Sequence, residues 1–266
     1  MEKVKPLKRF GQNYLKDNNI LDKIIKEINP SKNDFIIEVG PGLGALTSKL
    51  AETNAEVTAI EIDKRVKEDL AKKYPSVQFY HEDFLKTDLF KFYNLSGRKL
   101  RTAGNIPYNL TSPIIFKLIE DNRIINDAVL MVQYEVAKRI TTSPGSKDYG
   151  ILSVLLNYFA EVKFCFKVSP NVFYPKPKVY SAVIHIFMKE INISDELKKR
   201  FIQIVKASFG KRRKTLKNSL GDSIFKEIDF SDSGIDLSLR AEQLNIKDFE
   251  TLALYTLNNP SYNTGR

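Results

Sequence analysis

The chain has 266 residues, of which 42% are hydrophobic and 28% are charged, a composition typical of a globular protein with one large domain or a main domain plus a smaller one. No apolar run approaches the roughly 20 residues that a membrane span needs, and the N-terminus lacks the apolar core of a signal peptide, so we expect a cytoplasmic protein without membrane contact. The net charge of +10 indicates either a polyanionic partner, usually nucleic acid, or a surface charged for solubility, and charge alone does not separate the two.

Cysteine and histidine, which often build metal or reactive sites, are scarce. The single cysteine, Cys165, excludes an intramolecular disulfide and a thiolate metal cage, and its apolar neighbours indicate a buried structural thiol. His81 and His185 are far apart in strand-like stretches, where we expect packing roles. The sequence therefore predicts no metal site.

From residue 35 onward, short apolar runs alternate with helical patterns. The predicted strands are Phe35–Val39, Val57–Ile60, Val77–Tyr80, Leu100–Ala103 and Ala128–Val132. A helical pattern follows the first strand, and a charged helix is expected over Lys64–Lys73. This alternation predicts an α/β fold with a mainly parallel sheet and helices on both faces. Ligands of such sheets bind outside the carboxyl ends of the strands.

The pattern changes after about residue 160. Val162–Val168 and Ser181–Phe187 are typical of strands joined by a proline-rich loop, and they predict an antiparallel edge on the sheet. From Ser194, a predicted N-cap, the chain becomes helical and the alternation stops. We therefore predict an α/β domain over residues 1–188 and a small all-helical domain over residues 189–266.

A glycine-rich turn joins the first predicted strand to its helix. Gly40 and Gly42 lie in this turn, whose spacing satisfies the dinucleotide fingerprint and lets a ligand approach the backbone. Glu61 ends the second strand, where a carboxylate would accept hydrogen bonds from ribose hydroxyls. Asp83 follows the third, where it can accept from an adenine amino group. These features fit any adenosine-ribose cofactor, so NAD(H) and S-adenosyl-L-methionine both remain open at this point.

The motif Asn105-Ile106-Pro107-Tyr108 after the fourth strand suits methyl transfer to the N6 atom of adenine. The lone pair of this amine is delocalised into the ring, and two acceptors for its hydrogens would favour an electron-rich nitrogen. The Asn105 side-chain oxygen can be one acceptor and a backbone carbonyl near Ile106 or Pro107 the other, because proline restricts the backbone there. Tyr108 can stack on a base that is extruded from its helix. A turn without function is the alternative for such a tetrapeptide in isolation.

The chain resembles the KsgA/RsmA family of ribosomal RNA adenine dimethyltransferases, which is related to the Erm methyltransferases. Motifs in the family's order carry the resemblance over almost the whole length: Arg9–Leu15, Glu38–Gly44, Glu61–Asp63, Asn105–Asn109, Val132–Arg139, Phe173–Val179, Arg212–Leu216 and Arg240–Glu242. Tyr14 stands where the family often has phenylalanine, Ile106 where it often has leucine, and Tyr134 where it often has lysine, which removes one positive charge.

The resemblance implies a Rossmann-like class I methyltransferase domain, a helical C-terminal domain, and dimethylation of two adjacent adenosines in the hairpin near the 3′ end of small-subunit (16S) ribosomal RNA. It implies that Phe173 helps Tyr108 to sandwich the target base. It also implies cofactor contacts from Asn13, Leu15, Gly40, Gly42, Glu61, Asp83 and Asn105. The expected cofactor is S-adenosyl-L-methionine, and the expected partner is the small ribosomal subunit or its precursor, bound by a monomer.

Two basic segments are candidates for holding RNA through its phosphates. Lys8 and Arg9 belong to the first, and the second comprises Lys211, Arg212, Arg213, Lys214 and Lys217. A charge run is equally typical of a solvated face.

Three other functions remain as alternatives. An Erm-like enzyme would modify large-subunit RNA. A ribosome-assembly or RNA-binding factor would retain methylation only as a secondary activity. An NAD oxidoreductase is disfavoured, because no residues resemble a hydride-transfer acid or base.

Overall fold

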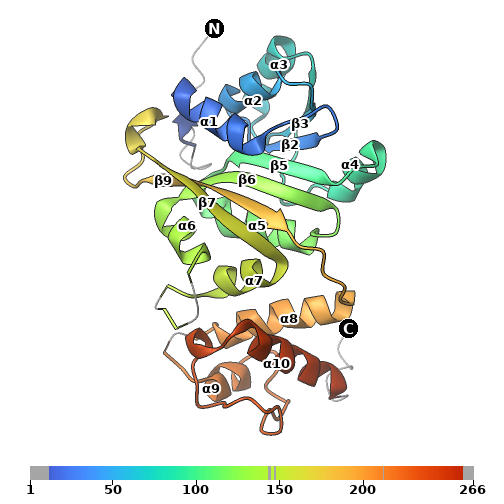
Figure 1. Cartoon of the computed structure of the whole chain (residues 1–266), viewed down its shortest axis with the longest axis vertical. Coiled ribbons are helices and arrows are strands. Elements are labelled where there is room, and N and C mark those ends of the chain that lie inside the picture. The colour runs from blue at the N-terminus through green and yellow to red at the C-terminus, as the bar shows by residue number, and fades with distance from the viewer. Residues whose placement is uncertain (1–11, 143–144, 147, 212, 260–266) are drawn as a thin grey trace. The chain divides into compact units, whose positions relative to one another are not determined.

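The computed structural model describes residues 12–142, 145–146, 148–211 and 213–259 (Figure 1). The chain divides into two compact units, the first comprising Met1–Ala137 and Glu161–Lys189, the second Lys138–Ala160 and Glu190–Arg266. The sequence predicts one boundary, between residues 188 and 189, whereas residues 138–160 also group with the C-terminal residues.

A seven-stranded sheet forms the centre of the first unit, in the order β4-β3-β2-β5-β6-β9-β7. Its strands are β2 (Phe35–Val39), β3 (Glu56–Ile60), β4 (Val77–Tyr80), β5 (Leu100–Asn105), β6 (Ile125–Gln133), β7 (Ala160–Val168) and β9 (Ser181–Met188). Strands β2 to β6 pair in parallel, and β9 pairs antiparallel to β6. The predicted mainly parallel sheet with an antiparallel edge is confirmed.

A second, two-stranded sheet joins distant parts of the chain. Strand β1 (Tyr14–Leu15) pairs antiparallel with β8 (Phe173–Tyr174), and Leu15 stands opposite Phe173. The Lys16 backbone N–H also donates to the Val172 carbonyl at 2.9 Å. These bonds fix residues 14–16 beside the proline-rich loop that precedes β9.

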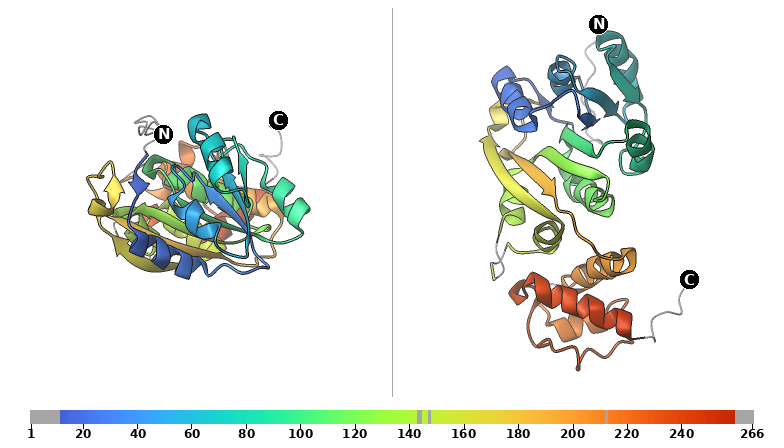
Figure 2. Two further views of the ribbon diagram at one scale, coloured as in Figure 1. Left: turned by 90° about the horizontal axis from the view of Figure 1, so that it is seen from above. Right: turned by 45° about the vertical axis from the view of Figure 1, so that its right-hand side comes forward.

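Helices lie on both faces of the seven-stranded sheet (Figure 2). They are α1 (Asn18–Ile28), α2 (Ala45–Leu50), α3 (Lys64–Lys73), α4 (Leu89–Ser96) and α5 (Thr111–Glu120), with the 3₁₀ helices η2 (Tyr108–Leu110) and η3 (Pro170–Val172). Helix α6 (Tyr134–Ile140) crosses the division between the units. All five residues of β2 are buried, as expected for a parallel strand covered on both faces.

The second unit is helical within its described residues. It contains α7 (Ile151–Phe159), α8 (Asp195–Ser208), α9 (Leu216–Gly221), η4 (Ala241–Gln243) and α10 (Ile246–Asn258). Tyr158 of α7 stacks on Phe201 of α8, with ring centroids 4.1 Å apart, and its hydroxyl donates to Glu250 of α10 at 2.6 Å. These contacts explain why α7 groups with the C-terminal helices. Ser194 caps α8 as predicted, accepting from the Leu197 N–H at 3.1 Å.

A buried ion-pair network closes the amino ends of the central strands. Asp127 of β6 receives two hydrogen bonds from Arg101 of β5, both 2.7 Å long, and one from His185 of β9, 2.6 Å long. Arg101 also donates to Asp34 at 2.8 Å and to the Ile28 carbonyl at 2.6 Å. Burial opposes ionisation of Asp127, but the hydrogen bonds from Arg101 and His185 outweigh it and lower the pKa of this carboxyl.

No helix in the described ranges combines the length and the apolar character needed to cross a membrane.

Candidate active site

A cavity of about 270 Å³ opens at the carboxyl ends of β2, β3 and β5. The residues that line it include all the cofactor contacts predicted from the sequence: Asn13, Leu15, Gly40, Gly42, Glu61, Asp83 and Asn105. Its position agrees with the general rule for ligands of parallel sheets.

The glycine-rich turn forms one wall of this cavity. Gly40 has a φ of +67°, and a Cβ placed there would meet no atom within 4 Å. Glycine at this position therefore suits the left-handed backbone and keeps the space above it open. The Gly42 N–H donates to Glu61 Oε2 at 3.0 Å, so the turn and the tip of β3 are held together.

Glu61 is fixed in place by backbone donors. Its Oε1 accepts from the Asp63 N–H at 2.8 Å, and its side chain is 4% exposed. Burial raises the pKa of this carboxyl, although the backbone hydrogen bonds partly offset the effect. A buried carboxylate whose partners are neutral N–H groups retains lone pairs that can accept ligand hydroxyls.

Glu38 is a second buried carboxyl that lines the cavity. Its Oε2 accepts from the Thr47 hydroxyl at 2.6 Å, and burial raises its pKa to about 8, with a further contribution from the charge of Glu61. The sequence analysis did not identify Glu38 as a site residue. Its signal was an acidic residue inside the apolar strand Phe35–Val39.

Asp83 lies just past β4, where its Oδ1 accepts from the Leu85 N–H at 3.0 Å. The same turn places Leu85 and Phe84 on the cavity wall. One carboxylate oxygen thus orients the turn, and the other can accept a donor from a ligand.

Asn105 is the last residue of β5, whereas the sequence predicted that the strand would end before it. Its Nδ2 donates to the Asn13 carbonyl at 2.8 Å. Only the amide nitrogen can donate to a carbonyl, so this contact fixes which side-chain atom is Oδ1. The side-chain oxygen of Asn105, a residue that lines the cavity, therefore remains as an acceptor.

Ile106, Pro107 and Tyr108 continue the cavity wall. The Pro107 carbonyl accepts from the Leu110 N–H at 2.9 Å, at the start of η2. The carbonyl of Ile106 is therefore the better candidate for a second acceptor. The Tyr108 hydroxyl lies 2.7 Å from the hydroxyl of Ser181, a partner that the sequence analysis did not identify.

The described residues at and just before β1 add two further lining residues that were not identified from the sequence. Gln12 and Tyr14 line the cavity, and the Tyr14 hydroxyl donates to Gln12 Oε1 at 2.7 Å. Burial raises the pKa of Tyr14 to about 12, helped by the charges of Asp63 and Glu61.

Comparison with known proteins assigns the chain to a family. The model of the ribosomal RNA adenine dimethylase family matches residues 4–257. The chain belongs to this family. The ribosomal RNA small subunit methyltransferase A of Francisella tularensis subsp. novicida is 46% identical over 259 residues, covering 94% of this chain and 97% of that protein.

Two solved structures extend the comparison. A dimethyladenosine transferase from Plasmodium falciparum gives a TM-score of 0.73 at 27% identity, covering 92% of this chain and 97% of the other. The 23S rRNA methyltransferase ErmE gives 0.64 at 25% identity, covering 92% and 98%. The family and the fold predicted from the sequence are thus confirmed.

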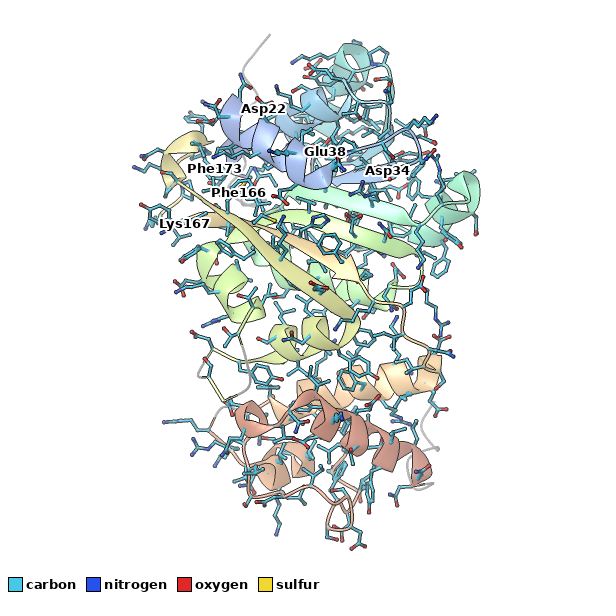
Figure 3. The ribbon with its side chains drawn as sticks, viewed as in Figure 1. Asp22, Asp34, Glu38, Phe166, Lys167 and Phe173 are labelled. Atoms are coloured by element: carbon cyan, nitrogen blue, oxygen red, sulfur yellow. The ribbon has the colours of Figure 1, made fainter. Side chains whose placement is uncertain are left out.

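Phe173, expected to face Tyr108 across the target base, has a different environment. It is 5% exposed and belongs to the apolar cluster that contains Leu15, with Phe166 packed against it (Figure 3). It is not among the described residues that line the cavity. Its role in holding the base stays a prediction.

The predicted RNA-binding residues are only partly described. Lys8, Arg9 and Arg212 lie outside the described residues. Lys211, Arg213, Lys214 and Lys217 are exposed in the second unit. Lys211 forms an ion pair with Asp222, and this pair lowers the pKa of the Asp222 carboxyl. RNA contact by these residues stays a prediction.

The remaining candidates have structural partners. His81 is exposed, and its Nε2 lies 3.1 Å from the Ile62 carbonyl, whereas His185 belongs to the Asp127 network. Cys165 is only partly buried, but burial raises the pKa of its thiol to about 12. Within the described ranges, no group of three or more His, Cys, Asp or Glu side chains is arranged to hold a metal.

Proposed function

We propose that this protein transfers methyl groups from S-adenosyl-L-methionine to the N6 atoms of two adjacent adenosines in the 3′-terminal hairpin of small-subunit ribosomal RNA, giving N6,N6-dimethyladenosine. The observation that carries the proposal is the orientation of the Asn105 amide. Its nitrogen donates to the Asn13 carbonyl, which leaves the Asn105 side-chain oxygen as an acceptor in the cavity wall. Membership of the adenine dimethylase family and the name of the Francisella relative support the reaction and the target.

The arrangement suits a weakly nucleophilic amine. The Asn105 oxygen and the Ile106 carbonyl would accept the two N6 hydrogens and favour a pyramidal nitrogen. The N6 lone pair then bonds to the methyl carbon as the carbon–sulfur bond breaks, its electron pair stays on sulfur, and one N6 proton leaves to solvent. After the first transfer only one hydrogen remains for these acceptors, so the pocket must allow N-methyladenosine to rotate.

The hydrogen-bond acceptors that line the cavity match the donors of the cofactor. Glu61 would accept from the ribose hydroxyls and Asp83 from the adenine amine, while Gly40 leaves room for close approach to the backbone. Asn13 and Leu15 on or beside β1 would cover the bound molecule. The cofactor itself supplies an electrophilic methyl group.

The partner in this proposal is RNA within the small subunit or its precursor, which gives the protein a role in ribosome biogenesis. The exposed lysines and Arg213 of the second unit, together with the net charge of +10, would bind phosphates. The choice among adenosines would come from RNA shape and from which bases flip out. We further propose that the protein acts as a monomer in the cytoplasm.

A second candidate is methylation of large-subunit RNA, because ErmE matches nearly the whole chain. The higher identity to the Francisella protein favours the small subunit.

The test is transfer of labelled methyl groups to small subunits that lack the modification, with large subunits in parallel. We expect N6,N6-dimethyladenosine on small subunits alone, and its loss in Asn105→Ala. Label on large subunits would instead support the Erm-like function. Absence of label on both, with cofactor bound, would exclude the enzyme and leave an RNA-binding or assembly factor.

A further inference from the structure

The pairing of β6 with β9 ends beside the candidate active site. Gln133 and Ser181 are the last paired residues, and beyond them the Tyr134 N–H donates to the Tyr180 carbonyl at 3.0 Å. Ser181 is also the partner of Tyr108, with the two hydroxyls 2.7 Å apart. Tyr134 and Tyr180 therefore lie directly beyond the end of the strand pair whose last residue, Ser181, contacts Tyr108, on which the target base is proposed to stack.

These two tyrosines belong to a cluster of rings around one lysine. The Lys167 ammonium lies 3.9 Å from the ring centroid of Tyr180 and 4.6 Å from that of Tyr134. Phe164, three residues before Lys167 on β7, packs edge-on against Tyr134, with the ring centroids 6.1 Å apart. We call Tyr134, Phe164, Lys167 and Tyr180 the edge platform, since β7 is the last strand of the sheet. Figure 3 marks Lys167 on this strand.

The edge platform remains accessible despite its apolar rings. Phe164 is 39% exposed and Tyr180 is 48% exposed, and Lys167 is exposed as well. Aromatic side chains serving only as core would be buried, whereas these offer ring surface to a partner.

The surrounding charge favours an anionic partner. From Val162 to Lys189 the chain has five lysines and no aspartate or glutamate. Another exposed ring, that of Tyr174, has the Lys16 ammonium 4.1 Å from its centroid. Rings combined with cations are the usual means of holding single-stranded nucleic acid, because every base has a face to stack and a phosphate to pair.

We propose that the edge platform binds an unpaired RNA base that neighbours the target adenosine, with Lys167 paired to its phosphate. The inference rests on the proposed function, because it takes Tyr108 as the site of the target base. Continuity through Ser181 favours RNA over a protein segment. Since stacking is tolerant of base identity, the platform would position the strand without reading its sequence.

The test uses an RNA hairpin with 2-aminopurine in place of a nucleotide adjacent to the target adenosines. Stacking quenches the fluorescence of this base, and anisotropy of an end label gives the affinity. We expect quenching with the unmodified protein. Tyr180→Ala should abolish the quenching and weaken hairpin binding about tenfold, while Tyr180→Phe, which keeps the ring, should preserve both. Lys167→Ala should weaken binding and reduce its salt dependence.

Phe187→Ala is the matched control. Phe187 is also on β9 and is 40% exposed, but it stands at the opposite end of the strand, opposite Asp127. Its removal should leave quenching and affinity unchanged. Calorimetric binding of S-adenosylhomocysteine shows for each variant that the fold and the cofactor site are intact.

Unchanged quenching and affinity in both Tyr180→Ala and Lys167→Ala, with S-adenosylhomocysteine still bound, would overturn the proposal. Loss of binding to whole subunits but not to the hairpin would also overturn it, because the platform would then contact another part of the subunit and not a base next to the target adenosine. Platform-dependent quenching without any methyl transfer would retain the platform and reject the proposed function. Methyl transfer together with unchanged quenching in the platform variants would retain the proposed function and reject the platform.

Discussion

The two ends of the parallel strands in the first unit both bury carboxylates, but they satisfy them differently. At the amino ends, Asp127 is held by Arg101 and His185, and the pKa of its carboxyl is lowered. At the carboxyl ends, Glu38 and Glu61 have neutral partners, and burial raises the pKa of both. Asp34 and Glu38, labelled in Figure 3, mark the two ends: Asp34 directly precedes β2, and Glu38 lies near the carboxyl end of that strand.

The carboxylates at the two ends therefore contribute to different properties, namely to stability at the amino ends and to ligand binding at the carboxyl ends. A buried carboxylate paired with a guanidinium contributes to the folded state, and its removal leaves a buried positive charge. A buried carboxyl with a raised pKa lacks a counter-charge, and the part of its burial cost that neutral hydrogen bonds leave can be offset by a ligand with donors or positive charge. The sheet therefore has one end that holds the strands together and one end that is prepared for a ligand.

The largest effect is expected at the amino end. Asp127→Asn removes the charge opposite Arg101 and should lower the free energy of unfolding by about 3–5 kcal/mol. Urea titration followed by circular dichroism measures this change. Lys163→Ala, which removes an exposed partner of Glu27, should change the free energy of unfolding far less and serves as the control. Equal effects of the two substitutions would contradict a special role for the buried network.

The next effect is expected at the carboxyl end, on binding rather than on folding. Glu61→Gln should weaken S-adenosyl-L-methionine binding by about 1.5–3 kcal/mol, roughly 10- to 150-fold, because a charged acceptor for the ribose hydroxyls is lost. Calorimetry on the folded variant measures it. The free energy of unfolding without ligand should change little. If Glu61→Gln destabilised the fold as much as Asp127→Asn, the two ends of the sheet would not differ in function.

Sequence patterns predicted the central part of the fold well. The strand Val77–Tyr80 and the helix Lys64–Lys73 have the predicted bounds, because their apolar spacing and caps are local properties. The grouping of α7 with the C-terminal helices was not predicted, because it depends on contacts such as Tyr158 with Phe201 and Glu250. Such long-range packing leaves no periodic signal in α7 itself.

In the site, too, the features that depend on local sequence patterns could be predicted, whereas the long-range contacts could not. Glu61, Asp83 and Asn105 could be predicted to line one cavity because each ends or follows a strand, and parallel strands bring their carboxyl ends together. The bond of Tyr108 with Ser181 and the ring contacts of Tyr134 with Lys167 join residues that are distant in the chain. From the sequence, Tyr134 could be identified as replacing a lysine that is frequent in the family, but its contact with Lys167 could not be predicted.

The third prediction concerns the pH dependence of stability. The folded pKa of Glu38 is about 8, above its unfolded value of 4.5, so between these values the folded state holds a proton that the unfolded state has released. The resulting stability is complete below pH 4.5 and is lost as the pH rises through 8. Between pH 6 and pH 7 the loss should approach about 1.4 kcal/mol.

Glu38→Gln should flatten this slope, since the amide does not titrate and can still accept from the Thr47 hydroxyl. Urea titrations of both proteins at several pH values provide the measurement. Glu61 contributes a slope of the same sign, so part of the dependence should persist in Glu38→Gln and disappear only in the double substitution. A slope that is identical with and without Glu38 would show that this carboxyl is ionised in the folded protein.

The smallest effect is expected for the neutral hydrogen bond that joins Tyr108 to Ser181. Tyr108→Phe removes this bond but keeps the ring, so we expect a loss of about 0.5–1.5 kcal/mol in stability and at most a severalfold fall in kcat/KM. Tyr108→Ala should lower kcat/KM by a further tenfold or more, because the stacking surface is lost as well. Burial raises the pKa of Tyr108, so its phenol stays protonated at neutral pH and the activity should not follow its titration there. If Tyr108→Phe were as inactive as Tyr108→Ala, the hydroxyl rather than the ring would carry the function of this residue, and the carboxyl end would depend on a fixed hydrogen bond as the amino end does.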